Sequence, residues 1–126
     1  MAGEQVLVVE DNEKNMKLFR DVLQATGYRT LEATTGEQAV ELATEHTPDL
    51  VLMDIQLPDI DGVDAFGRLR ADERTASIPV LALTAQAMHG DRERFLAAGF
   101  DGYLSKPVNV VELIGAVRQH CDGRSR

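Results

Sequence analysis

The sequence predicts an α/β protein with an open, doubly wound sheet of five parallel strands and helices on both faces, a (βα)5 arrangement. Short apolar runs rich in β-branched residues alternate five times with longer amphipathic stretches. Runs such as Val6–Val9 and Leu50–Met53 are apolar at successive positions, which is typical of strands covered on both faces of a parallel sheet. No linker-like or low-complexity tract interrupts the pattern, so we expect residues 1–126 to form one domain with a core at about residues 5–121.

Each predicted element follows from this pattern in chain order. The strands are expected at Gln5–Val9, Arg29–Ala33, Asp49–Met53, Pro79–Leu83 and Gly102–Ser105. The helices are expected at Glu13–Thr26, Thr35–His46, Val63–Asp72, Met88–Ala98 and Asn109–Cys121. Phe19 and Leu23 fall on one face of the first helix, as Leu113 and Val117 do on the last, which indicates that these faces pack on the sheet.

Residues at the ends of the helices agree with these assignments. Two pairs before the second helix have the spacing of capping boxes, namely Thr34 with Glu37 and Thr35 with Gln38. Gly27 and Gly99 stand where a helix C-terminus favours a positive φ. Asn109 has the side chain of an N-cap, and residues 59–62 (Asp-Ile-Asp-Gly) are interpreted as a turn into the third helix.

Composition and charge exclude several classes of protein. The chain has 126 residues, with 13 Lys and Arg against 21 Asp and Glu, and a formal net charge of −8. Nucleic acid binding requires clustered basic residues, so this charge argues against it. Cys121 is the only cysteine, which excludes an intramolecular disulfide. No apolar run approaches the roughly 18 residues of a membrane helix or has the features of a signal peptide, so we expect a soluble cytoplasmic domain without a membrane partner.

Residues able to do chemistry follow four of the five predicted strands. The first strand is followed by Glu10 and Asp11, the third by Asp54, the fourth by Thr84 and the fifth by Lys106. In parallel sheets of this kind, ligands bind beyond the carboxyl ends of the strands. We therefore expect three acids, a hydroxyl and a lysine to converge at one edge.

Such a cluster would need a cation. Like charges about 4 Å apart repel by roughly 4 kcal/mol at an effective dielectric constant of 20. Oxygen ligands without a nearby histidine or cysteine favour magnesium, or manganese in its place. We expect Asp11 and Asp54 to be direct ligands and Glu10 to act through water. With such an ion the pocket suits transfer of a phosphoryl group to Asp54 as the nucleophile.

The same residues also have ordinary structural explanations. An acid just before a helix stabilises its N-terminal dipole, which would account for Glu10 and Asp11. Thr84 fits a strand residue whose hydroxyl is satisfied locally, and Lys106 fits a solvated lysine. Asp54 is harder to explain in this way, because a carboxylate at the end of a buried strand is costly without charged partners.

Four segments together resemble a known family. They are V-V-E-D-N at Val8–Asn12, L-M-D-I-Q-L-P at Leu52–Pro58, L-T-A at Leu83–Ala85 and Y-L-S-K-P at Tyr103–Pro107. Their order and spacing are similar to those of the response-regulator receiver domain of two-component signalling, over nearly the whole chain. Among members of that family, the chain looks most like the single-domain response regulators.

The resemblance implies a role for each acidic residue. Asp54 would accept a phosphoryl group from a phosphohistidine on a histidine kinase or histidine phosphotransfer protein. Asp11, Asp54 and the backbone carbonyl of Gln56 would bind magnesium, and Glu10 would hold a metal-bound water. Lys106 would pair with a phosphoryl oxygen.

The resemblance also implies a conformational switch. Thr84 would move toward the phosphoryl group, and Tyr103 would turn its ring inward. The Lys106–Pro107 peptide bond would be cis. Gln56 and Gln86 occupy the two positions that tune the lifetime of the acyl phosphate in this family.

The expected output is contact with other proteins. Downstream targets would bind a monomer at the face formed by the fourth helix, fifth strand and fifth helix, without a DNA-binding output domain. We expect no enzymatic turnover beyond the domain's own phosphorylation and dephosphorylation. Three other functions stay open: a cofactor carrier sharing the flavodoxin-like fold class, an aspartyl phosphatase, which would want a second acid where Gln56 stands, and a module that binds partners regardless of phosphorylation.

Overall fold

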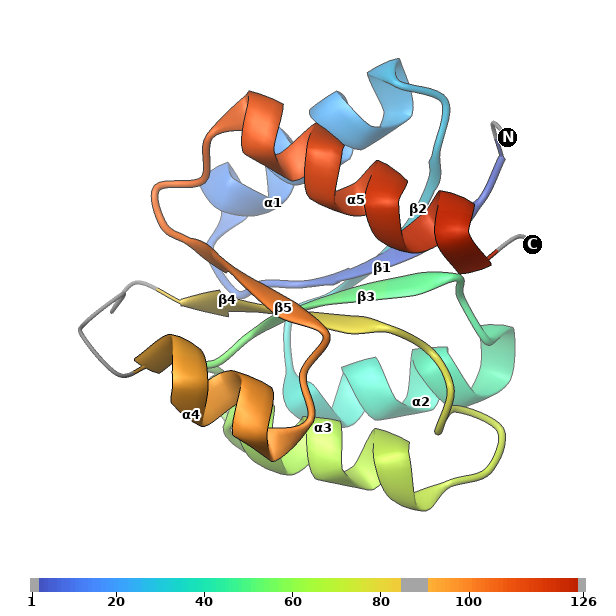
Figure 1. Ribbon diagram of the computed structural model, residues 1–126, viewed down its shortest axis with the longest axis vertical. Coiled ribbons are helices and arrows are strands. Elements are labelled where there is room, and N and C mark those ends of the chain that lie inside the picture. The colour runs from blue at the N-terminus through green and yellow to red at the C-terminus, as the bar shows by residue number, and fades with distance from the viewer. Residues whose placement is uncertain (1–2, 85–90, 125–126) are drawn as a thin grey trace.

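The computed structural model describes residues 3–84 and 91–124 and shows a five-stranded sheet between two layers of helices (Figure 1). The strands are β1 (Gln5–Val9), β2 (Arg29–Ala33), β3 (Leu50–Asp54), β4 (Val80–Thr84) and β5 (Gly102–Ser105). The helices are α1 (Glu13–Ala25), α2 (Gly36–His46), α3 (Gly62–Ala71), α4 (Asp91–Ala98) and α5 (Val110–Arg124). The predicted fold class is confirmed.

All neighbouring strands are parallel, in the order β2-β1-β3-β4-β5. The change of direction in the strand order lies between β1 and β3, so the loops that follow these two strands diverge at the carboxyl edge and leave room for a ligand there. Helices α1 and α5 cover one face of the sheet, and α2, α3 and α4 cover the other (Figure 1). This arrangement places the ends of β1, β3 and β4 side by side.

The core consists of one apolar layer on each face of the sheet. Val6 and Val8 of β1 pack in the layer under α1 and α5, whereas Leu7 and Val9 pack in the layer under α2, α3 and α4. All four side chains are fully buried. Alternate residues of one strand therefore serve opposite layers, which is why the run is apolar at every position.

Two strands end one residue later than the sequence predicts. Asp54 is the last residue of β3, where it pairs with Leu83, and Thr84 is the last residue of β4, where it pairs with Ser105. Both residues thus belong to the sheet itself, and their positions are fixed by its hydrogen bonds. The predicted start of the fourth helix, Met88, lies outside the described residues.

The N-terminus of α2 differs from the predicted pair of capping boxes. Thr35 is the N-cap, and its side chain accepts a hydrogen bond from the Gln38 amide. The Gln38 side chain accepts a hydrogen bond from the amide of Thr34, while Glu37 forms an ion pair with Arg68. The Thr34–Glu37 capping box is therefore wrong, because the helix begins one residue later than that box requires.

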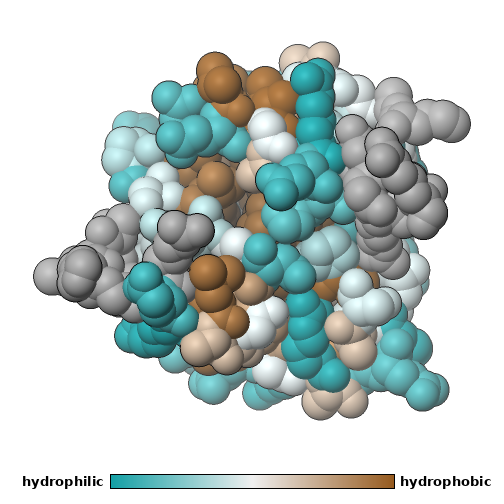
Figure 2. All heavy atoms as spheres, viewed as in Figure 1, coloured by the Kyte–Doolittle hydropathy of each residue, from teal (hydrophilic) through white to brown (hydrophobic). Residues whose placement is uncertain are grey.

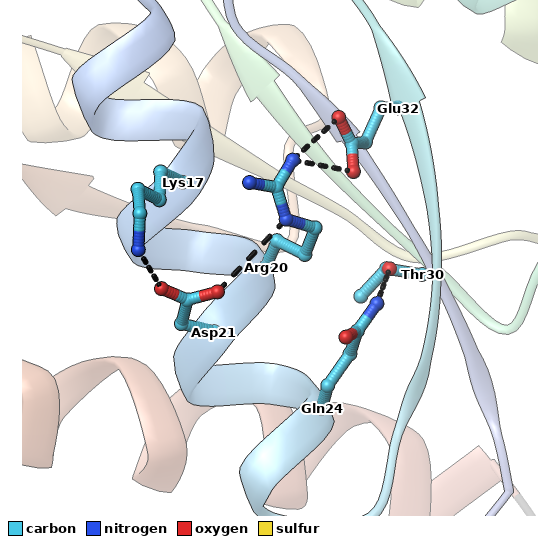
Figure 3. Close-up of polar contacts among 6 residues, drawn as sticks. All are labelled: Lys17, Arg20, Asp21, Gln24, Thr30 and Glu32. Atoms are coloured by element: carbon cyan, nitrogen blue, oxygen red, sulfur yellow. Dashed lines mark hydrogen bonds and ion pairs between the residues drawn. The ribbon is translucent and has the colours of Figure 1, made fainter.

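The edge strand β2 is tied to α1 by polar side chains (Figure 3). Arg20 contacts both carboxylate oxygens of Glu32, at 3.1 and 3.2 Å, and Gln24 donates a hydrogen bond of 2.9 Å to the Thr30 hydroxyl. Charged groups beside an edge strand disfavour pairing with another chain. In the part of the chain that the structure describes, no helix is both long and apolar enough to span a bilayer.

Two carboxylates near the surface, Asp59 and Asp72, indicate how the stability of the fold depends on pH in acid. Hydrogen bonds from the Glu37 and Gly36 amides lower the pKa of Asp59 to about 2, and those from Arg74 lower the pKa of Asp72 to about 2. Both values are below the ordinary 3.8, so the unfolded state binds protons first as the pH falls. Their stabilising contribution is complete above pH 3.8 and is lost as the pH falls through about 2.

We therefore expect the urea midpoint of the wild-type chain to fall over this acidic range, and to fall less in the double variant Asp59→Asn, Asp72→Asn. Urea unfolding followed by circular dichroism at several pH values measures the difference. Equal acid sensitivity of the two proteins would show that other carboxyls dominate.

Candidate functional site

Three carboxylates meet at the carboxyl edge of the sheet. Glu10 and Asp11 follow β1, and Asp54 ends β3, which is hydrogen-bonded to β1. Carboxylate oxygens of all three lie within 4.8 Å of one another. Glu10 and Asp54 are 1% and 4% exposed, whereas Asp11 is exposed to solvent. The convergence predicted from the strand ends is present.

Lys106 bridges the two buried carboxylates. Its ammonium nitrogen lies 2.7 Å from Glu10 Oε1 and 2.8 Å from Asp54 Oδ2. The lysine follows β5, at the far end of the sheet order from β2, and its backbone amide donates a 2.8 Å hydrogen bond to the Thr84 carbonyl. The sequence placed Lys106 at this edge but did not indicate a contact with Glu10.

Burial and charge act on these groups in opposite directions. Burial raises the pKa of Glu10, and the nearby Asp54 charge raises it further, while the hydrogen bond from Lys106 lowers it without cancelling the rise. Burial alone would lower the pKa of Lys106, but its hydrogen bonds to Asp54 and Glu10 outweigh this and raise it. The lysine is therefore firmly protonated, and the ionised form of Glu10 is destabilised, mainly by burial and also by the nearby charge of Asp54.

Backbone amides orient the carboxylates. The Gln56 amide donates a 3.0 Å hydrogen bond to Asp54 Oδ1, and the Asn12 amide donates a 3.2 Å hydrogen bond to Glu10 Oε2. Asp54 therefore has one oxygen held by an amide and the other by Lys106. Its side chain is fixed at the end of the strand.

Helix α3 begins against the backbone of Asp54. The Gly62 amide donates a 2.8 Å hydrogen bond to the Ile55 carbonyl, which closes the intervening loop, residues 55–61. A Cβ atom at Gly62 would lie 2.3 Å from the Asp54 carbonyl oxygen and 2.8 Å from Ile55 Cα. Only glycine permits this approach, because backbone atoms cannot move aside as a side chain can.

The donor set fits a hard divalent cation. Carboxylates of Glu10, Asp11 and Asp54 supply oxygen ligands, and they outnumber the single ammonium group of Lys106 by three charges to one. Magnesium typically takes one or two carboxylates and keeps water or phosphate oxygens as its other ligands. The exposed carboxylate of Asp11 leaves the cluster open to solvent on one side, where such ligands can enter.

The residues expected to form the switch lie on β4 and β5, the two strands that follow β3 in the sheet order. Thr84 is 5% exposed at the end of β4, and Tyr103 on β5 is half-buried against the layer under α2, α3 and α4. The Lys106–Pro107 bond is cis, which confirms the prediction. Gln86 lies outside the described residues.

The sequence is similar to known signalling proteins. The family model for the response regulator receiver domain matches residues 6–118. The polar-differentiation response regulator DivK of Brucella ovis is 49% identical over 115 residues, which cover 91% of this chain and 94% of that protein. DivK of Brucella anthropi is 48% identical over the same shares of both chains.

Solved structures show the same architecture. The receiver domain of the sensor histidine kinase PA1611 from Pseudomonas aeruginosa PAO1 has a TM-score of 0.88 and 40% identity, over 96% of this chain and 99% of that chain. That structure contains a magnesium ion coordinated in the active site cleft. The chemotaxis protein CheY4 of Vibrio cholerae has a TM-score of 0.87 and 25% identity, over 94% and 99% of the two chains.

Proposed function

The chain belongs to the response regulator receiver domain family, whose members are phosphorylated on an aspartate, and we propose that Asp54 is its phosphoacceptor. The supporting observation is the position of its carboxylate. Asp54 is nearly buried at the end of β3, with Lys106 on one oxygen and the Gln56 amide on the other. Glu10 is held in a similar way, by Lys106 and the Asn12 amide, but burial raises the pKa of Glu10 and so disfavours its ionised, nucleophilic form.

The proposed transfer is an in-line displacement at phosphorus. A carboxylate oxygen of Asp54 forms a bond to the phosphorus atom, and the bond from phosphorus to the imidazole nitrogen of the donor's phosphohistidine breaks. The electron pair of the broken bond stays on that imidazole nitrogen. The donor is a histidine kinase or a histidine phosphotransfer protein in the cytoplasm.

The other residues of the cluster are proposed to stabilise the phosphoryl group and to bind the metal ion. After transfer, the Lys106 ammonium group can pair with a phosphoryl oxygen instead of the Asp54 carboxylate. Asp11, Asp54 and the Gln56 carbonyl would hold magnesium, or manganese, with Glu10 acting through water. The bound ion would neutralise charge on the phosphoryl oxygens. The burial of Asp54 and Glu10 limits the access of water and strengthens these electrostatic interactions.

Signal output is proposed to run through Thr84 and Tyr103 to the face formed by α4, β5 and α5. Phosphorylation adds acceptor oxygens beside Thr84 and thereby favours one arrangement of the neighbouring segments. Figure 2 shows hydrophobic residues among hydrophilic ones on this side. A hollow of about 400 Å³ lies there, lined by residues of α4, β5 and α5 that include Leu96, Tyr103 and His120. A monomer would present this hollow to a downstream protein.

The lifetime of the acyl phosphate is proposed to depend on Gln56 and Gln86. The Gln56 side chain is exposed, and its backbone amide contacts the Asp54 carboxylate directly. An amide side chain there can orient or obstruct an attacking water. Hydrolysis of this bond is the only turnover we propose for the domain.

We expect the wild-type chain to gain the mass of one phosphate when incubated with acetyl phosphate and magnesium, because Asp54 can attack a small donor directly. Intact-mass spectrometry measures the gain, and hydroxylamine should remove it.

The variant Asp11→Asn should be labelled much more slowly at limiting magnesium, since the substitution removes an anionic ligand. Equal labelling rates for wild type and Asp11→Asn across a magnesium titration would contradict the ligand assignment.

A further inference from the structure

The loop of residues 55–61, between β3 and α3, is anchored to a helix that lies outside the candidate site. Asp59 Oδ1 accepts a 2.8 Å hydrogen bond from the Gly36 amide, and Oδ2 accepts a 2.9 Å hydrogen bond from the Glu37 amide. Both amides belong to the first turn of α2, where backbone N–H groups have no acceptor within the helix. A carboxylate that accepts two such bonds at the positive end of a helix makes a strong contact.

The packing around this contact is close. A Cβ atom at Gly36 would lie 2.3 Å from Ile60 Cγ1 and 3.4 Å from Asp59 Oδ1. Ile60 and Leu57 of the same loop pack against the layer under α2, α3 and α4. The loop therefore lies directly on the start of α2, and the Asp59 carboxylate binds the loop to the helix.

Helix α2 has a separate N-cap of its own. The Thr35 side chain accepts the Gln38 amide hydrogen bond, and the Gln38 side chain accepts that of Thr34. Loss of the Asp59 carboxylate would leave these contacts in place. The main consequence would fall on the loop, which would lose the side-chain hydrogen bonds that hold it to α2.

The loop matters because it carries Gln56. The Gln56 amide holds Asp54 Oδ1, and its carbonyl belongs to the ligand set of the proposed function, on which this inference rests. Fixing such a loop in advance reduces the entropy lost when a ligand binds. We propose that Asp59 is a positioning residue, which holds the loop against α2 so that Gln56 stays in place to bind a divalent cation.

The test is a magnesium titration of the full chain, followed by backbone amide shifts in ¹⁵N NMR spectra. For Asp59→Ala we expect the magnesium dissociation constant to rise by about tenfold, the lower end of what outer contacts contribute to metal affinity. Asp59→Asn should recover part of the affinity, because its amide oxygen can still accept one hydrogen bond. If Asp59→Ala does not fold, Asp59→Asn carries the test against wild type.

Asp72→Ala is the matched control. Asp72 is a partly exposed carboxyl whose pKa is also lowered to about 2, but its partner is Arg74, in the segment between α3 and β4. Its loss should lower the melting temperature and leave magnesium affinity unchanged. The proposal is overturned if the Asp59 variants bind magnesium like wild type, or if Asp72→Ala weakens binding equally. A wild-type chain that binds magnesium but takes no phosphate from acetyl phosphate would refute the proposed function alone.

Discussion

Asp54→Asn is expected to take up no phosphate from acetyl phosphate under conditions in which the wild-type chain is labelled. Glu10, which also contacts Lys106 and a backbone amide, does not replace Asp54 as the nucleophile, because burial raises the pKa of Glu10 and disfavours its ionised form. The substituted side chain lacks the nucleophilic carboxylate oxygen. Its carbonyl oxygen could still accept the hydrogen bond from the Gln56 amide. The variant should therefore fold, and intact-mass spectrometry should report complete loss of labelling.

Asp49→Asn is a control on the same strand. Asp49 precedes β3 and accepts a hydrogen bond from the Gln5 amide, at the opposite end of the strand from Asp54. The two residues are five steps apart along the chain, which places their Cα atoms roughly 17 Å apart in an extended strand. Asp49→Asn should be labelled like wild type. Persistent labelling of Asp54→Asn would move the acceptor elsewhere, and equal binding of a partner to wild type and Asp54→Asn would favour a module that ignores phosphorylation.

Three strands have the predicted bounds, but β3 and β4 are displaced by one residue, and the reason is physical. The predicted strand Asp49–Met53 begins and ends one residue before β3, because the prediction ended the strand at the last apolar residue, Met53. In the folded chain the backbone of Asp54 pairs with Leu83, while its side chain is stabilised by Lys106. The cost of the buried charge is offset by a residue 52 positions away, which a local pattern does not contain.

In the candidate site, too, the features set by topology could be predicted, and those set by side-chain contacts could not. Convergence of Glu10, Asp11 and Asp54 was predictable, because it follows from parallel topology alone. The contact of Lys106 with Glu10 was not, because it depends on side-chain geometry at the edge of the sheet. The contact of Asp59 with α2 was not predictable either: residues 59–62 were interpreted as a local turn, but the Asp59 carboxylate accepts hydrogen bonds from the first turn of a helix that begins 23 residues earlier.

Lys106→Met should cost the metal-free protein roughly 3 kcal/mol of unfolding free energy. Methionine keeps the apolar stem of the side chain but removes the ammonium group from between Glu10 and Asp54, which then lack their fixed counter-charge. Uptake of a proton by Glu10, whose pKa burial already raises, would relieve part of this cost. Urea unfolding at neutral pH, with and without magnesium, measures the effect.

Lys17→Met is the control that isolates the contribution of burial. Lys17 also forms a short ion pair, 2.6 Å from Asp21, but 69% of the Lys17 side chain and 53% of the Asp21 side chain are exposed (Figure 3). Exposed pairs of this spacing contribute about 0.5 kcal/mol or less, so Lys17→Met should be nearly neutral. Magnesium should stabilise Lys106→Met more than it stabilises wild type, because the ion binds a cluster that has lost its bridging ammonium group. If the two lysine variants lost equal stability, the buried carboxylates would not need Lys106, and its place in the phosphoryl site would lose its electrostatic basis.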